Sequence, residues 1–127
     1  MSAASGFRFY YQDDSVFRSI AGGLADKYGF HSMFDGLYER RMSRGEWWAL
    51  VLRTIRYVQD CDTGETYVNL ARLLDGKDCY IVTTNQDAQF YRVFPAERIT
   101  RLQGDWRYFQ CGRRCHDAVY PNHEQLG

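Results

Sequence analysis

Two side chains that could bind a polar ligand, Asn85 and Asp87, directly follow an apolar run of the sequence. The run Cys79–Thr83 carries no charge and is rich in β-branched residues, so it predicts a buried strand that ends just before them. In open α/β sheets, ligands bind beyond the carboxyl ends of the strands, which makes this amide and this carboxylate candidate site residues. The alternative is that both side chains only form an Asx turn.

A pair of cysteines could bind a metal. The chain has four cysteines, at positions 61, 79, 111 and 115. Only Cys111 and Cys115 have the spacing of metal ligands, and a structural zinc needs four ligands, to which only His116 and His123 could contribute after Cys115. The pair therefore predicts half of a zinc site, and two surface thiols without a metal are the alternative.

Hydrophobic periodicity predicts a mainly helical first part, followed by alternating strands and helices. The predicted elements are helices at 15–27, 33–42, 43–59 and 66–74, a strand at 79–83, a short helix at 88–94 and a strand at 98–103. Ser43-x-x-Glu46 has the pattern of a capping box. A helix between two strands predicts a right-handed parallel crossover. Residues 121–127 are expected to fray.

Composition favours a soluble globular chain. Acidic and basic residues balance at 16 each, which offers no electrostatic case for nucleic acid or for an anionic membrane. Three Trp, ten Tyr and eight Phe could stack on bases, but most of them fall on the helical stripes that a core must bury. No apolar run approaches the ~18–20 residues that span a bilayer, and the N-terminus lacks the features of a signal peptide. We therefore expect a cytoplasmic protein.

Four motifs occur in the order found in one family, the sirtuins (silent information regulator family). The segment 83–87 (TTNQD) resembles the sirtuin Thr-Gln-Asn-x-Asp motif, and 102–105 (LQGD) resembles the catalytic His-Gly motif with Gln103 in place of the histidine. The segment 111–115 (CGRRC) falls where sirtuins begin their zinc ribbon. Residues 1–7 (MSAASGF) resemble the tail of the sirtuin phosphate-binding motif.

The resemblance implies an α/β fold, namely an incomplete Rossmann-like parallel sheet with a helical small-domain insertion and the first half of a zinc ribbon. It also implies that residues 1–127 are an internal piece of a sirtuin catalytic domain, which we expect to be inactive alone. In that layout, the implied segments are 1–11 for the end of the phosphate-binding motif, 15–76 for the helical part, 78–105 for strand, helix, strand and catalytic motifs, and 106–127 for the start of the zinc ribbon.

The resemblance implies that the enzyme consumes NAD by breaking the bond between nicotinamide and ribose. The cofactor-binding residues that it implies are Ser2, Ala3, Ser5, Gly6, Tyr10, Thr84, Asn85 and Asp87. Small residues at the N-terminal positions would let the pyrophosphate reach backbone N–H groups. The chain departs from the family at Thr84, where glutamine is usual, and after Phe7, where the usual Asp and Arg are missing.

Gln103 decides which reaction the resemblance implies. In deacylating sirtuins, the histidine at this position takes a proton from a ribose hydroxyl, which a carboxamide cannot do. The implied catalytic set of Asn85, Asp87 and Gln103 is therefore similar to the sirtuin branch that transfers ADP-ribose to a protein, whose implied acceptor is a lipoylated carrier protein and whose implied partner is a macrodomain protein. The alternatives are an NAD-dependent protein deacylase, an inactive remnant and a non-catalytic zinc or interaction module.

Overall fold

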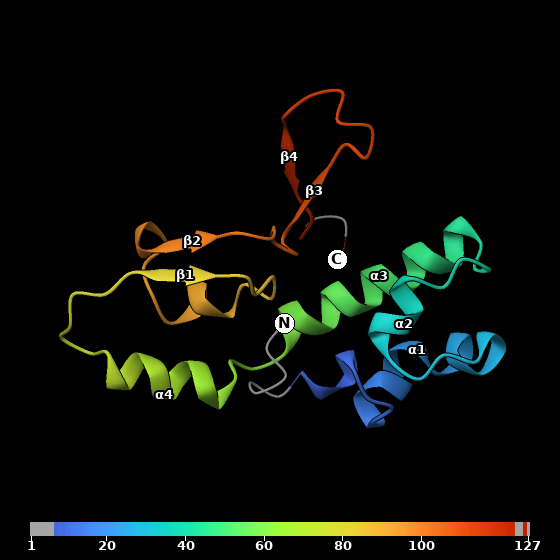
Figure 1. Cartoon of the computed structure of the whole chain (residues 1–127), viewed down its shortest axis with the longest axis horizontal. Coiled ribbons are helices and arrows are strands. Elements are labelled where there is room, and N and C mark those ends of the chain that lie inside the picture. The colour runs from blue at the N-terminus through green and yellow to red at the C-terminus, as the bar shows by residue number, and fades with distance from the viewer. Residues whose placement is uncertain (1–6, 124–125, 127) are drawn as a thin grey trace. The chain divides into compact units, whose positions relative to one another are not determined.

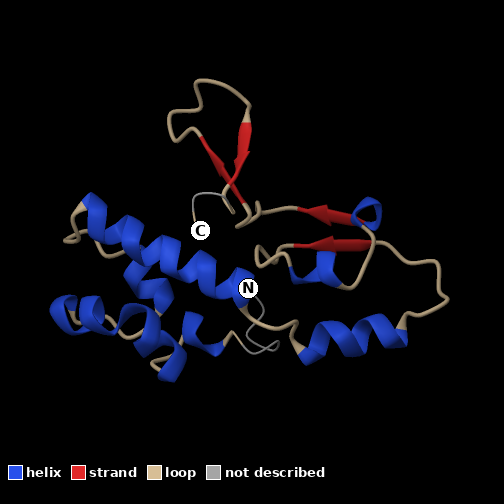
Figure 2. Cartoon of the chain, turned by 180° about the vertical axis from the view of Figure 1, so that it is seen from behind, coloured by secondary structure: helices blue, strands red, loops and turns tan. Residues whose placement is uncertain are grey.

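The computed structural model describes residues 7–123 and 126 (Figures 1 and 2). The chain divides between Asp60 and Cys61 into two compact units. The first unit is helical, and the second contains the strands together with one α-helix. The predicted mixed α/β character is therefore confirmed.

The helical unit contains a short 3-10 helix, η2 (Arg8–Tyr10), and three α-helices: α1 (Ser15–Tyr28), α2 (Met33–Leu37) and α3 (Arg44–Asp60). Its core is aromatic and aliphatic, and its fully buried side chains include Phe9, Phe17, Met33, Leu50 and Val58. The helices α1 and α3 follow the predicted periodicity closely. The Asp14 side chain caps α1 by accepting a hydrogen bond from the Phe17 N–H, and Gly29 ends the helix with a φ of 76°.

The helix α2 is shorter than predicted, because it ends at Leu37 and not at Met42. The Glu39 carboxylate accepts hydrogen bonds from the backbone N–H and the guanidinium of Arg41. Such local side-chain bonds give the backbone a partner other than a further helical turn. They also hold the pKa of Glu39 at about 2.

The predicted capping box of α3 is confirmed. The Ser43 hydroxyl accepts a hydrogen bond from the Glu46 N–H at 3.3 Å, and the Glu46 carboxylate accepts one from the Ser43 N–H at 2.9 Å. The same carboxylate also accepts bonds from Lys27 at 2.6 Å and from the Tyr28 hydroxyl at 2.9 Å, which ties α1 to α3. The hydrogen bond from Lys27, followed by those from Ser43 and Tyr28, holds the pKa of Glu46 at about 2.

The second unit contains α4 (Glu65–Leu73) and two small sheets. The strands β1 (Ile81–Thr83) and β2 (Ile99–Arg101) pair in parallel, with Ile81 opposite Ile99, as the crossover predicted. They lie side by side in Figure 1. Two short 3-10 helices, η3 (Gln89–Arg92) and η4 (Ala96–Arg98), connect them, so the helix predicted at 88–94 is shorter and more tightly wound than expected.

The prediction of a buried strand at 79–83 was wrong. Tyr80 and Val82 are 57% and 63% exposed, and Cys79 lies before β1 in a half-buried position. Among the described residues, β1 pairs with β2 alone, so a two-stranded sheet leaves much of its surface in contact with solvent. Burial increases only at the end of β1, where Thr83 is 8% exposed.

An antiparallel hairpin that the periodicity did not reveal follows the parallel pair. It consists of β3 (Tyr108–Gln110) and β4 (Val119–Pro121), and the loop 111–118 joins them. The side chain of Asn122 is fully buried and donates to the Trp106 carbonyl oxygen at 2.8 Å, while its N–H donates to the Arg107 carbonyl oxygen at 2.9 Å. The fraying expected from residue 121 onward therefore does not begin at Pro121 or Asn122.

Within the described part of the chain, no helix is both long enough and apolar enough to cross a bilayer.

Gly36 gives a test of how tightly the helical core is packed. A Cβ atom at Gly36 would lie 2.8 Å from the Phe30 ring and 3.0 Å from Leu50, whereas one at Gly23 in α1 would meet no atom within 4 Å. We expect Gly36→Ala to lower the free energy of unfolding by about 1–3 kcal/mol through overpacking. Gly23→Ala should raise it by about 0.5–1 kcal/mol, because alanine is the better helix former.

Urea unfolding followed by circular dichroism measures both changes. Equal effects of the two substitutions would contradict the close packing of Gly36 against Phe30 and Leu50.

Candidate functional site

A buried polar cluster forms where the chain leaves β1. The Thr83 hydroxyl accepts a hydrogen bond from the Asn85 N–H at 2.9 Å, which turns the backbone immediately after the strand. Ala88 follows with a φ of 58°, so the chain reverses again before η3. The two turns leave Asp87 only 3% exposed, while Asn85 is half-buried and Thr84 is exposed.

Tyr67 of α4 joins the two predicted site residues. Its hydroxyl donates to Asp87 Oδ2 at 2.8 Å and accepts from Asn85 Nδ2 at 2.9 Å. Asp87 Oδ1 accepts the Gln89 N–H at 3.0 Å. The sequence analysis missed Tyr67, because its position on an apolar helical stripe indicates core packing; the one available signal was that a buried tyrosine hydroxyl usually finds a partner.

Gln89 extends this network into the interior. Its side chain is fully buried; its Oε1 accepts the Gly64 N–H at 3.2 Å and its Nε2 donates to Cys61 Sγ at 3.5 Å. Cys61 therefore accepts a hydrogen bond from a buried side chain. Burial raises the pKa of the Cys61 thiol, so this sulfur favours the neutral form.

The third predicted catalytic residue, Gln103, lies beside the same turn. Its backbone carbonyl accepts a hydrogen bond from Gln86 Nε2 at 2.7 Å, and Gln86 Oε1 accepts the Trp106 indole N–H at 2.6 Å. The Gln103 residue itself is exposed. Gly104 follows with a φ of 94°, a conformation that favours glycine. The structure thus joins the segment 83–87 to the segment that carries Gln103.

A cavity of about 580 Å³ begins one residue after Gln103, between the end of β2 and the hairpin. The residues that line it are Arg101, Gly104, Asp105, Tyr108, Phe109, Gln110 and Val119. The Asp105 side chain is 4% exposed, and Arg101 and Arg107 both pair with it. Burial opposes its ionisation, but the hydrogen bonds from Arg107 and the charges of Arg107 and Arg101 together outweigh burial and lower the pKa of Asp105.

Of the other predicted cofactor residues, Tyr10 lies in the helical unit. Ser2, Ala3, Ser5 and Gly6 lie outside the described residues. Tyr10 lies in η2, where its ring packs edge-on against Tyr11 and Phe34 at centroid distances of 4.8 and 5.9 Å, and burial raises its pKa.

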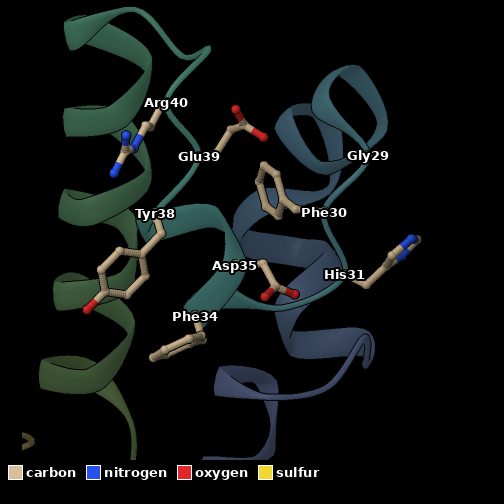
Figure 3. Close-up of a pocket in the computed structure, with 8 residues that line it drawn as sticks. All are labelled: Gly29, Phe30, His31, Phe34, Asp35, Tyr38, Glu39 and Arg40. Carbon is tan, nitrogen blue, oxygen red and sulfur yellow. The ribbon is translucent and has the colours of Figure 1, made fainter.

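Phe34 also lines a cavity of about 600 Å³ in this unit (Figure 3). Phe30 and Asp35 belong to the same lining, whereas the His31 ring points away from the other labelled side chains. Tyr10 therefore packs against the lining of this helical-unit cavity through Phe34.

The loop of the β3–β4 hairpin brings together three groups that could bind a metal. One ligand atom each from Cys111, Cys115 and His116 lies within 4.8 Å of the other two, and the two sulfur atoms are 3.1 Å apart. Hydrogen bonding from the Cys115 backbone lowers the pKa of Cys111, whereas the hydrogen bond with Cys111 raises the pKa of Cys115, so this contact favours a thiolate at Cys111. Two sulfurs and an imidazole fit three of the four ligands of a tetrahedral zinc. His123 is not part of this group.

Comparison with known proteins found two relatives that match almost the whole chain, and no family model matches. The chain is 30% identical to a "Protein ADP-ribosyltransferase" of Staphylococcus aureus (strain Mu50 / ATCC 700699), over 99% of the chain and 40% of the relative. It is 29% identical to a "Probable bifunctional ADP-ribose hydrolase/ADP-ribosyltransferase" of Fusarium oxysporum f. sp. cubense, over 96% of the chain and 21% of the relative.

The chain is therefore a distant homologue of protein ADP-ribosyltransferases along nearly its whole length, and it spans less than half the length of these relatives. The motifs between residue 83 and residue 115 lie within this matched region.

The Cys111, Cys115 and His116 group makes a specific prediction about zinc. His116→Ala should weaken zinc binding by more than about tenfold, because the loss of a ligand costs at least as much as the loss of a group that orients one. His123→Ala is the matched control and should leave the affinity unchanged. Competition with a chromophoric zinc indicator measures both affinities. Weakening by His123→Ala alone would show that the third ligand is His123 and not His116.

Proposed function

We propose that this chain is part of a sirtuin-type enzyme that cleaves nicotinamide from NAD and transfers the ADP-ribose to a protein acceptor. The observation that carries the proposal is the match of nearly the whole chain to a Staphylococcus aureus relative that is named protein ADP-ribosyltransferase. The position of Asn85, Asp87 and Gln103 around one turn supports it. A Rossmann-like completion of the parallel sheet and a zinc ribbon around the hairpin are part of the same proposal.

Asn85 has the chemistry to bind the ribose of NAD. Its Nδ2 is engaged by Tyr67, and among the described residues its Oδ1 accepts no hydrogen bond. The side chain is half-buried, so this oxygen can meet a ligand that donates hydrogen bonds, as ribose hydroxyls do. Thr84, exposed beside it, adds a hydroxyl, and both residues fit the cofactor role that the family resemblance implies.

Asp87 has a different role in the proposal. Both of its oxygens accept bonds from the protein, and the residue is 3% exposed, so the proposal gives it no direct contact with NAD. Its carboxylate is linked to the Asn85 amide through the Tyr67 hydroxyl and is only weakly screened by water. A fixed anion at this place favours the positive charge that develops on the ribose when nicotinamide leaves.

The carboxamide of Gln103 favours ADP-ribosyl transfer over deacylation. A carboxamide does not take up a proton near neutral pH, so Gln103 cannot act as a general base. Gln103 can still form a hydrogen bond with a ribose hydroxyl or with the acceptor.

We propose a lipoylated carrier protein as the acceptor, as the family resemblance implies. The Fusarium relative is named as both an ADP-ribose hydrolase and an ADP-ribosyltransferase. That name supports a partner that removes ADP-ribose, which the family resemblance implies to be a macrodomain protein.

Release of nicotinamide from NAD tests the proposed function. The 127-residue chain and the product of the complete gene are each incubated with NAD and a lipoylated carrier protein, and separately with NAD and an acetylated peptide. We expect the gene product to release nicotinamide and to label the carrier, and to leave the peptide acetylated. Deacetylation of the peptide, or no release with either acceptor, would overturn the proposal.

The variant Asn85→Ala should lower the rate of nicotinamide release by about 100-fold, as the loss of one preorganised polar group at a reacting centre does. Asn69→Ala is the matched control, because Asn69 lies exposed on α4 of the same unit. A similar loss of activity in both variants would indicate damage to the fold instead of loss of a ligand contact. Mass spectrometry of the carrier and chromatography of nicotinamide give the two readouts.

A further inference from the structure

We infer that Tyr67 is a positioning residue of the NAD site, because its hydroxyl fixes the orientation of the Asn85 amide against the buried Asp87 carboxylate. This inference rests on the proposed function and deepens it. Tyr67 belongs to α4, far from both motif segments in the sequence, and it matches none of the family motifs on which that proposal rests.

The described contacts among Tyr67, Asn85 and Asp87 fix the arrangement of their hydrogens. A carboxylate accepts hydrogen bonds only, so the single hydrogen of the Tyr67 hydroxyl points to Asp87 Oδ2, which lies 2.8 Å away. The hydroxyl oxygen then offers a lone pair to Asn85 Nδ2 at 2.9 Å. The amide must therefore turn its NH₂ group inward, which leaves Oδ1 as the outward atom.

The neighbours of the Tyr67 hydroxyl restrict its movement. Tyr67 is 2% exposed, and its ring packs edge-on against Phe90 at a centroid distance of 4.7 Å and an angle of 89°. Asp87 cannot rotate freely either, because its second oxygen accepts the Gln89 N–H at 3.0 Å. Exclusion of water strengthens these hydrogen bonds relative to exposed ones.

The direction of the Asn85 amide matters for the reaction. With Oδ1 outward, Asn85 accepts a hydrogen bond from a ribose hydroxyl and so directs the hydrogen of that hydroxyl; with the amide reversed, the NH₂ group donates to the hydroxyl oxygen instead and leaves that hydrogen undirected. Loss of the Tyr67 hydroxyl removes the preference for one orientation while the ring still fills its place in the core. The resulting defect should lower kcat more than it changes KM, because the misdirected group acts on the reacting ribose.

The matched pair Tyr67→Phe and Tyr80→Phe tests the contact itself. Each variant removes one hydroxyl, but the Tyr80 hydroxyl pairs with Thr100 Oγ1 at 2.8 Å on an exposed part of the sheet. In ¹H–¹⁵N NMR spectra of the 127-residue chain, Tyr67→Phe should shift the Asn85 side-chain amide signals and the Gln89 backbone amide signal. Tyr80→Phe should leave them in place. Unchanged signals in Tyr67→Phe would overturn the inference.

A second NMR measurement applies if Tyr67→Phe does not fold. In the parent chain, the Asn85 side-chain amide hydrogens should exchange with solvent more slowly than those of the exposed Asn69. Equal exchange would show that the Asn85 amide is not held, and it would overturn the inference without any variant.

Kinetics of the complete gene product test the consequence for function. Tyr67→Phe should lower kcat for nicotinamide release by about 10- to 100-fold, with the KM for NAD within about threefold of the parent value. When combined with Asn85→Ala, it should cause no further loss. An unchanged kcat in Tyr67→Phe, or full additivity of the two losses, would overturn the positioning role. If the parent releases no nicotinamide, the proposed function fails, and the NMR comparison still decides whether Tyr67 orients Asn85.

Discussion

Solvation of the Asp87 carboxylate is the constraint on which the second unit depends. A buried carboxylate costs several kcal/mol unless the protein replaces the water that it loses. Here the replacement comes from two places in the chain, the Tyr67 hydroxyl on α4 and the Gln89 N–H at the start of η3. Both elements must therefore be in place for the turn after β1 to be stable. The helix, the strand and the turn are connected by this polar contact as well as by apolar packing.

The side chains of the turn after β1 contact two different parts of the second unit. Asn85 and Asp87, two positions apart, both reach Tyr67, whereas Gln86 between them reaches the segment of Gln103 and Trp106. In the motif that the turn resembles, the position of Gln86 is variable. In this chain, Gln86 nevertheless provides the side-chain bonds that join the two motif segments. A variable position in a family motif can thus have a defined structural role in an individual protein.

The success of the sequence predictions depends on how local their signals are. The capping box of Ser43 and Glu46 and the periodicity of α1 and α3 involve residues close in sequence, and the structure has them as predicted. The exposure of Val82 depends on how many strands flank β1, which an apolar run cannot reveal. The β3–β4 hairpin is also set by distant contacts, because the buried Asn122 pairs with the backbone near its first strand.

The candidate site also contains residues that the sequence could predict and a residue that it could not. Asn85, Asp87 and Gln103 could be named because the order of the motifs points to them, and their packing around one turn is consistent with that prediction. Tyr67 could not be named, because its two polar partners lie 18 and 20 positions away in the sequence. Only the fold shows that a residue on an apolar stripe also carries a polar contact.

The buried Asn122 has a consequence for the cysteine group. By joining β4 to the backbone before β3, it closes the base of the loop 111–118, so the conformational entropy of bringing the ligand-bearing residues together is lost during folding and not during metal binding. If the two thiols and the imidazole bind zinc as proposed, they would do so as a chelate whose effective concentration is high before any ion arrives. Zinc affinity would then be coupled to the amide of Asn122, which does not itself belong to the ligand group.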